Sequence, residues 1–101
     1  MNEMEKLQLE IGDWQEQTFP DSTISSVLSH LAKEIIELSD AVKEGNTEKI
    51  KEELADCQHL IFGAGNKVGV NVYESTIEKF GINKKREWGK PDKNGVVEHL
   101  R

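Results

Sequence analysis

The sequence predicts an all-α fold, an antiparallel bundle of about four helices that is completed by oligomerisation. Apolar residues recur at alternating steps of three and four along much of the chain, which places them on one face of a helix. Ser, Thr or Asn residues stand where such stretches begin, and Gly residues stand where two of them end. Because these residue types cap helices, they divide the chain into four segments.

The four expected helices cover residues 2–17, 22 or 23–44, 46 or 47–68, and 71–86. Pro20 prevents the first helix from continuing. Asn71 and Glu74 resemble a capping box at the start of the fourth helix. The remaining residues, 87–101, contain two glycines and a proline, so we expect an irregular tail there.

The second and third helices each carry a regular apolar stripe. The stripe residues are Ile24, Leu28, Leu31, Ile35, Leu38 and Val42 in the second helix, and Ile50, Leu54, Cys57, Ile61, Ala64 and Val68 in the third. Only Gly45 and Asn46 connect the two helices, and short connections make antiparallel neighbours. We therefore expect a hairpin with the two stripes facing each other.

The length of 101 residues fits one domain, residues 1–101. The net charge of -6 argues against non-specific binding to nucleic acid or to membranes. Cys57 is the only cysteine, which is the simpler pattern for a reducing compartment. The first residues lack the basic-then-apolar order of a signal peptide, so we expect a cytoplasmic protein.

Two pairs of carboxylates mark the predicted hairpin. Glu34 and Glu37 are three residues apart in the second helix, and Glu53 and Asp56 are three apart in the third. This spacing puts both members of a pair on one side of a helix. Both pairs lie on the same rotational side of their apolar stripes, so antiparallel packing brings all four beside the seam. There they repel one another unless a cation neutralises them.

Two interpretations of these pairs remain open from spacing alone. Carboxylate oxygens suit a hard cation, Mg²⁺ with Mn²⁺ as a substitute. The alternative is a solvated acidic face, because the chain has 19 acidic residues and repeats the same spacing elsewhere, as in Glu10–Asp13 and Asp13–Glu16.

The sequence around these pairs resembles the E-x-x-E…E-x-x-D signature of the MazG-like, all-α nucleotide pyrophosphohydrolases. The local text, HLAKEIIEL from residue 30 and EELAD from residue 52, agrees with that signature. The fourth helix ends in a pattern similar to the family's K-x-x-x-N-x-x-R-x-W, formed by Lys79, Asn83, Arg86 and Trp88. The tail is similar to a compact subgroup found in phage and bacteria. Lys33 departs from the pattern, since many members carry an acidic residue there.

The resemblance implies Mg²⁺-dependent hydrolysis of a nucleoside triphosphate, often a deoxynucleotide, to the monophosphate and pyrophosphate. It implies that one or two ions bind the substrate phosphates and activate a water for attack on the α-phosphorus. The residues implied both as catalytic and as metal ligands are Glu34, Glu37, Glu53 and Asp56.

Lys79, Asn83 and Arg86 share one face of the fourth helix and suit phosphate oxygens. The alternative for the two cations is a favourable interaction with the dipole at the C-terminal end of that helix.

Aromatic residues and a histidine complete the predicted substrate site. Trp88, Phe19 and Trp14 are candidates for stacking on a base, although for Trp14 the core is the expected environment. His30 lies one turn before Glu34, where it either hydrogen-bonds to a carboxylate or lines the core.

Ile36 and Phe62 point away from the main apolar stripes, which suggests an interface between copies. The resembled family forms dimers or tetramers, so we expect a homodimer or homotetramer that binds a nucleoside triphosphate. The alternative function is a non-catalytic helical oligomerisation or nucleotide-binding module.

Overall fold

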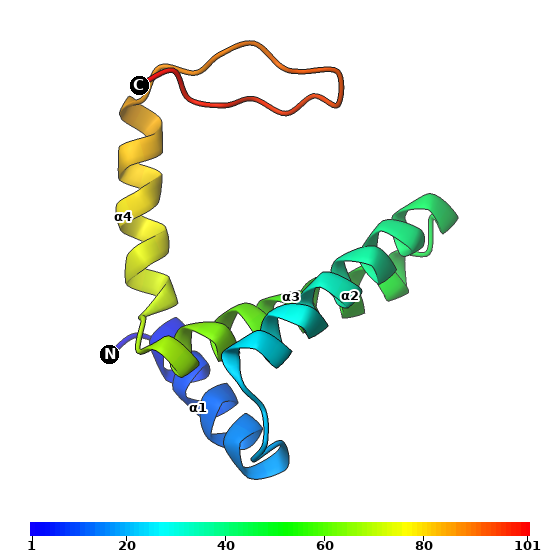
Figure 1. The fold of residues 1–101 in the computed structure, drawn as a ribbon, viewed down its shortest axis with the longest axis vertical. Coiled ribbons are helices and arrows are strands. Elements are labelled where there is room, and N and C mark those ends of the chain that lie inside the picture. Colours follow the sequence, from blue (N-terminus) through cyan, green and yellow to red (C-terminus); the bar gives the residue numbers. More distant parts are fainter.

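The computed structural model describes residues 1–101 and contains four α-helices, with no strand beyond one bridged residue pair, which confirms the all-α class. None of the helices is long and apolar enough to cross a membrane. In chain order the helices are α1 (Glu3–Thr18), α2 (Ile24–Glu44), α3 (Thr47–Val68) and α4 (Val72–Lys85) (Figure 1).

The helix ends confirm the capping residues that the sequence predicts. Thr23, Asn46 and Asn71 each accept a hydrogen bond from the backbone N–H three residues later, at 3.1–3.2 Å. Gly45 and Gly69 have φ angles of 68° and 71°, a left-handed conformation that Gly adopts at little cost and that ends α2 and α3. The observed helix limits therefore lie close to the predicted ones.

The helices α2 and α3 form the predicted antiparallel hairpin and lie side by side (Figure 1). Each apolar stripe, however, splits into two rows with a spacing of seven residues. The more buried rows are Ile24, Leu31 and Leu38 in α2 and Ile50, Cys57 and Ala64 in α3. The more exposed rows, which we call the apolar face, are Leu28, Ile35 and Val42 in α2 and Leu54, Ile61 and Val68 in α3. Only part of each stripe is therefore covered within one chain.

The helix α1 packs on α3 through polar and small residues, not through its apolar stripe, which consists of Leu7, Ile11 and Trp14. Gln8 and Gly12 are its buried residues, and the side chain of Asn66 fills the space that a Cβ at Gly12 would need. The prediction that Trp14 lies in the core is wrong, since its side chain is 57% exposed and meets the ring of Phe19 edge-on at 5.6 Å. Close approach of the two backbones decides which face of α1 is buried.

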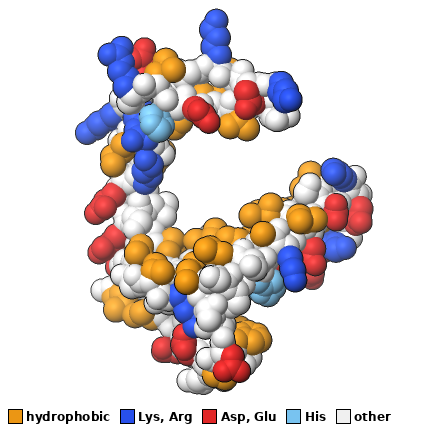
Figure 2. All heavy atoms as spheres, in the orientation of Figure 1, with side chains coloured by type: hydrophobic (Ala, Val, Ile, Leu, Met, Phe, Trp, Pro, Cys, Tyr) orange, Lys and Arg blue, Asp and Glu red, His pale blue; other side chains and the backbone are white.

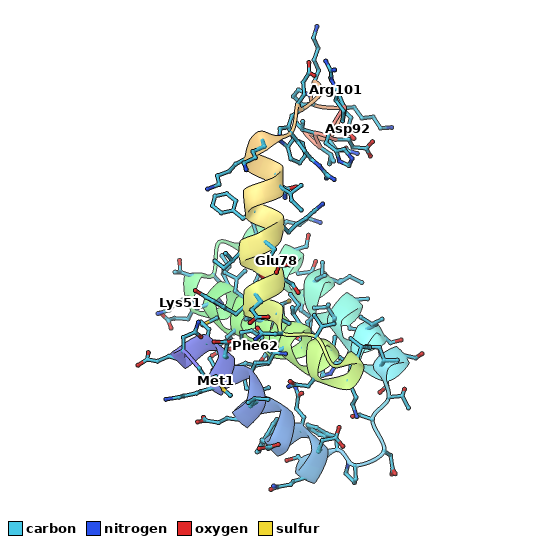
Figure 3. The ribbon with its side chains drawn as sticks, turned by 90° about the vertical axis from the view of Figure 1, so that its left-hand side faces the viewer. Met1, Lys51, Phe62, Glu78, Asp92 and Arg101 are labelled. Atoms are coloured by element: carbon cyan, nitrogen blue, oxygen red, sulfur yellow. The ribbon has the colours of Figure 1, made fainter.

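Phe62 corrects another prediction. The sequence suggested that Ile36 and Phe62 lie together at an interface between copies, but Phe62 is 1% exposed whereas Ile36 is 62% exposed. Figure 3 shows Phe62 near the crossing of α1 and α3. A second face of α3 is buried because α1 packs there, and the apolar stripe of α3 alone does not reveal that contact.

Together with residues 86–88, which follow it, the helix α4 forms an arm that extends away from the other three helices (Figures 1 and 3). It has no buried residue, and it contacts α1 and α3 but not α2. The tail that follows doubles back on itself, with a bridge between Trp88 and His99 and a turn at Gly95, where φ is 80°. The tail has no regular strand, as expected.

The chain exposes more surface than a compact protein of its mass. Its accessible surface is 7690 Å² for 11.4 kDa, against about 5,800 Å² expected for a folded monomer of that mass. Its radius of gyration is 15.9 Å, against about 13 Å for a compact chain of this length. Hydrophobic side chains gather along the face of the hairpin that is turned toward the tail (Figure 2). About 1,900 Å² of excess surface is thus left for other contacts.

Replacing Phe62 by Ala should lower the free energy of unfolding by about 3–5 kcal/mol, because a buried aromatic side chain leaves a cavity. Urea denaturation at one fixed protein concentration measures this change. The control is Leu9→Ala, which trims a half-exposed side chain on α1 and should cost less than about 1 kcal/mol. Equal losses for the two variants would contradict the burial described for Phe62.

Candidate metal centre

Three carboxylates from the hairpin meet beside the α2–α3 seam. Glu34 and Glu37 come from α2 and Glu53 from α3, and one oxygen of each lies within 4.8 Å of the others. The spacing of three residues in α2 puts Glu34 and Glu37 on one side of the helix, and the antiparallel partner brings Glu53 to that side. We call these three residues the acidic cluster.

The acidic cluster is partly removed from water. Glu53 is 8% exposed and the Glu34 side chain is 13% exposed, whereas Glu37 is exposed. The Oε2 atoms of Glu34 and Glu53 are buried and meet no hydrogen-bond donor. Buried charged oxygens without donors are costly. The residues therefore fit a hard divalent cation, which takes oxygen ligands.

The electrostatics of Glu53 reflect the same crowding. A hydrogen bond shared with the Glu34 carboxyl, burial, and the charges of Glu34, Glu37 and Asp56 together raise the pKa of Glu53 from 4.5 to about 7, and the hydrogen bond makes the largest contribution. Burial, followed by the nearby carboxylates, also raises the pKa of the Cys57 thiol. The cluster thus holds more negative charge than its surroundings can neutralise.

One histidine contacts the acidic cluster, and a second lies near Asp56. The Nε2 atom of His30 is 3.1 Å from Oε1 of Glu34, which is the hydrogen bond to a carboxylate that the sequence allowed, and the ring is not in the core. Asp56 is not among the three clustered residues, and its Oδ1 lies 4.0 Å from Nδ1 of His59. Sequence reasoning missed His59, although its position three residues after Asp56 places it on the same side of α3.

A pocket adjoins the cluster on the side of His30. It lies where the end of α1 and the start of α2 approach each other, and His30 forms part of its wall. Its lining residues are Gln15, Phe19, Ser22, Ser26, Val27 and His30. The sequence pointed to Phe19 and His30 here but missed the polar residues, because only the packing of α1 brings Gln15 next to α2.

The predicted phosphate-binding residues lie on the arm, apart from the acidic cluster. Lys79 and Asn83 line one shallow pocket on α4. The indole Nε1 of Trp88 donates a hydrogen bond to the backbone oxygen of Asn83 at 2.9 Å, and Nη1 of Arg86 is 3.3 Å from Nδ1 of His99. The structure therefore brings Lys79, Asn83, Arg86 and Trp88 together with one another. Because α4 does not contact α2, it does not bring them to the acidic cluster of the same chain.

Replacing Glu53 by Gln should raise the melting temperature of the metal-free protein at pH 8 but change it little at pH 4. The folded protein holds the Glu53 proton up to about pH 7, whereas the unfolded chain releases it near the ordinary pKa of 4.5. Ionisation therefore costs stability as the pH rises from about 4.5 to 7, and Gln avoids that cost. Thermal melts in EDTA test this, with Glu52→Gln as the exposed control. A gain of the same size at both pH values would contradict the assignment.

Comparison with known proteins identifies the family. Residues 7–101 match the dATP/dGTP pyrophosphohydrolase family. A dATP/dGTP diphosphohydrolase of cyanophage S-2L is 32% identical over 97 residues, which cover 94% of this chain and 86% of that protein. A dATP/dGTP diphosphohydrolase of Salmonella phage PMBT28 is 29% identical over 92 residues, which cover 89% of this chain but only 29% of that longer protein.

A solved structure has the same fold. It is the cyanophage S-2L MazG-like pyrophosphohydrolase bound to dGDP and three catalytic Mn²⁺ ions per active site. The two chains are 28% identical, each is covered over its full length, and the TM-score is 0.79. The chain described here belongs to the MazG-like dATP/dGTP pyrophosphohydrolase family, as the resemblance of its paired carboxylates predicted.

Proposed function

We propose that this protein hydrolyses deoxynucleoside triphosphates, with dATP and dGTP as the preferred substrates, to the monophosphate and pyrophosphate. The observation that carries the proposal is the acidic cluster, in which three carboxylates converge within 4.8 Å and two buried oxygens lack donors. The names of the two phage relatives support the choice of substrate. We expect the protein to act in the cytoplasm, where its substrates are made.

Glu34, Glu37 and Glu53 would hold divalent cations, Mg²⁺ or Mn²⁺, with Asp56 at the edge of the cluster. Such ions supply positive charge for the triphosphate oxygens and make water a better nucleophile. The sequence allowed one or two ions, and the cyanophage relative binds three. Four acidic side chains with two oxygens each are enough for more than one ion, which is what we propose.

The protein's own groups have defined tasks in the reaction. His30 holds Glu34 in place through its Nε2 atom. A carboxylate of the cluster accepts a proton from the attacking water. The new bond joins the water oxygen to the α-phosphorus, and the bond from the α-phosphorus to the bridging oxygen breaks, so that pyrophosphate leaves.

The pocket beside His30 would receive the base. It continues from the acidic cluster, because His30 both lines it and hydrogen-bonds to Glu34. The ring of Phe19 offers a stacking surface, and the Gln15 amide can hydrogen-bond to a base edge.

A second copy of this chain would cover the apolar face. The whole chain, with its arm and tail, exposes about 1,900 Å² more than a compact monomer of its mass, which is enough surface for an obligate homodimer interface. The two half-exposed rows of α2 and α3 repeat every seven residues, which suits packing against another helical hairpin. We therefore propose a homodimer or homotetramer.

The same assembly would complete the site. Lys79, Asn83, Arg86 and Trp88 lie on an arm that does not contact α2 within the chain. We propose that the arm of one copy presents Lys79 and Arg86 to a triphosphate held at the acidic cluster of a second copy. An Arg side chain can bind two phosphate oxygens at once, which Lys cannot do.

The purified protein should release pyrophosphate from dATP and dGTP in the presence of Mg²⁺ or Mn²⁺ and not in EDTA. An assay across the eight common nucleoside and deoxynucleoside triphosphates measures this directly. Glu37→Gln should reduce turnover to background, because it removes a charge from the cluster without changing the shape of the side chain. Glu44→Gln, an exposed glutamate at the end of α2, is the control. Normal turnover by Glu37→Gln, or nucleotide binding by the wild type without turnover, would contradict the proposal.

Mixing two defective variants tests whether the arm acts on a second copy. Arg86→Ala should lower kcat/KM by about 10- to 100-fold, since a charged contact is lost. Glu53→Gln should be inactive. Hetero-oligomers of the two, purified by two affinity tags, contain sites with both an intact cluster and an intact arm. They should regain about half of the wild-type activity per dimer if the arm crosses between copies. Activity no higher than that of the two separate variants would mean that each arm serves its own chain.

A further inference from the structure

The direction of α4 is set by a short elbow, residues 69–72, which links α3 to the arm. Gly69 ends α3 in a left-handed conformation, and Val72 is the first residue of α4. Gly65 approaches the elbow closely: a Cβ there would lie 2.6 Å from Cγ2 of Val72 and 2.9 Å from the Val70 oxygen. The elbow thus rests tightly on the last turns of α3.

One buried side chain from α1 makes hydrogen bonds to both Val70 and Val72 of this elbow. Gln8 is only 4% exposed, although it is polar. Its Nε2 donates to the Val70 oxygen at 2.8 Å, and its Oε1 accepts from the Val72 N–H at 2.9 Å. The second bond satisfies one of the N–H groups that a helix start leaves without a partner. Gln8 therefore connects Val70 in the elbow to Val72 at the start of α4 through two hydrogen bonds.

Asn66 of α3 fixes the orientation of the Gln8 amide. The Nε2 of Gln8 also donates to Oδ1 of Asn66 at 3.2 Å, and Nδ2 of Asn66 donates back to the backbone oxygen of Gln8 at 2.8 Å. Beside it, Nδ2 of Asn71 donates to Oε2 of Glu5 at 2.6 Å. Two residues of α1 are thus bonded to the elbow, and Gln8 makes the buried contacts.

Within one chain the arm has few other means of keeping its direction. No residue of α4 is buried, and the helix does not contact α2. Lys79 lies about 10 Å and Arg86 about 20 Å along the helix from Val72. A swing of about 10° at the elbow would therefore move Arg86 by more than about 3 Å. Displacements of about 1 Å in a substrate-positioning group can cost about 100-fold in rate.

We propose that Gln8 is a positioning residue for nucleotide hydrolysis. Its hydrogen bonds to the elbow fix the direction of α4, and that direction places Lys79 and Arg86 at the substrate phosphates. The proposal rests on the function proposed above. Gln8 itself touches neither substrate nor metal. Its effect on the reaction should therefore pass through the arm alone and leave the acidic cluster unchanged.

A double-mutant cycle separates this role from a general loss of stability. Gln8→Met keeps the length of the side chain but removes its bonds to Val70 and Val72. It should lower kcat/KM by about 10-fold or more, as Arg86→Ala does. In the double variant Gln8→Met/Arg86→Ala, kcat/KM should fall by less than the product of the two single factors. Both changes remove the same contact between Arg86 and the substrate phosphates, and that contact can be lost only once. Mn²⁺ affinity measured without nucleotide should be unchanged in Gln8→Met.

Phe62→Leu is the matched control, because it weakens the buried packing of α3 and makes none of the hydrogen bonds of the elbow. Combined with Arg86→Ala, its effect on kcat/KM should multiply. If Gln8→Met does not fold, Gly65→Ala takes its place in the cycle, since the added Cβ pushes on Val70 and Val72. Multiplying losses for Gln8→Met, or for Gly65→Ala in its place, would overturn the proposal.

A distance measurement tests the elbow independently of activity. Spin labels at Lys51→Cys and Glu78→Cys, in a Cys57→Ala background diluted with unlabelled protein, report the direction of α4 relative to the hairpin (Figure 3). The distance distribution should be narrow in the otherwise unchanged protein and shifted or broadened by Gln8→Met. An unchanged distribution would overturn the proposal even if the enzyme is active. If Gln8→Met shifts the distribution but the wild-type protein releases no pyrophosphate, the proposed function is refuted and the structural role of the elbow stands.

Discussion

The mutual repulsion of Glu34, Glu37 and Glu53 is the constraint on which the rest of the structure depends. The hairpin of α2 and α3 holds their oxygens within 4.8 Å, and two of those oxygens are buried without donors. Without a cation, the protein relieves part of this repulsion by keeping a proton on Glu53, whose pKa rises to about 7. The same arrangement favours a divalent cation at neutral pH, because the cation replaces the proton and adds charge for a phosphate. A feature that costs stability in the free chain is thus the basis of the proposed chemistry.

A second constraint is that one chain cannot cover its own apolar surface. The packing of α1 on α3 uses Gln8, Gly12 and Asn66, so the apolar stripe of α1 stays outside. The apolar face of the hairpin is also uncovered, and α4 has no buried residue. The proposed assembly with a second copy would account for both observations. It would cover the apolar face, and it would bring an arm with Lys79 and Arg86 near the acidic cluster of another chain. Stability and catalysis would then depend on the same contacts.

Much of the fold was predictable from the sequence because its signals are local. Thr23, Asn46 and Gly45 act on the backbone within a few residues, so helix limits follow from residue type. The convergence of Glu34, Glu37 and Glu53 was predictable because a short loop leaves the hairpin one arrangement. Burial was harder to predict. Phe62 and Trp14 were assigned to the wrong environments because α1 packs through glycine and amide groups, which leave no hydrophobic pattern in the sequence. The separation of the arm from the cluster depends on the elbow angle, and no spacing of residues encodes that angle.

The most direct test of the account is where a metal ion binds before any nucleotide is present. Substoichiometric Mn²⁺ broadens the nuclear magnetic resonance signals of amides close to its binding site, and a ¹⁵N-labelled sample reports every backbone position at once. The account predicts that signals from residues 34–37 of α2 and 53–56 of α3 disappear first, while signals from the acidic residues of α1 persist. Broadening that begins at Glu10 and Asp13, or that spreads evenly over the acidic surface, would contradict a metal centre at the acidic cluster.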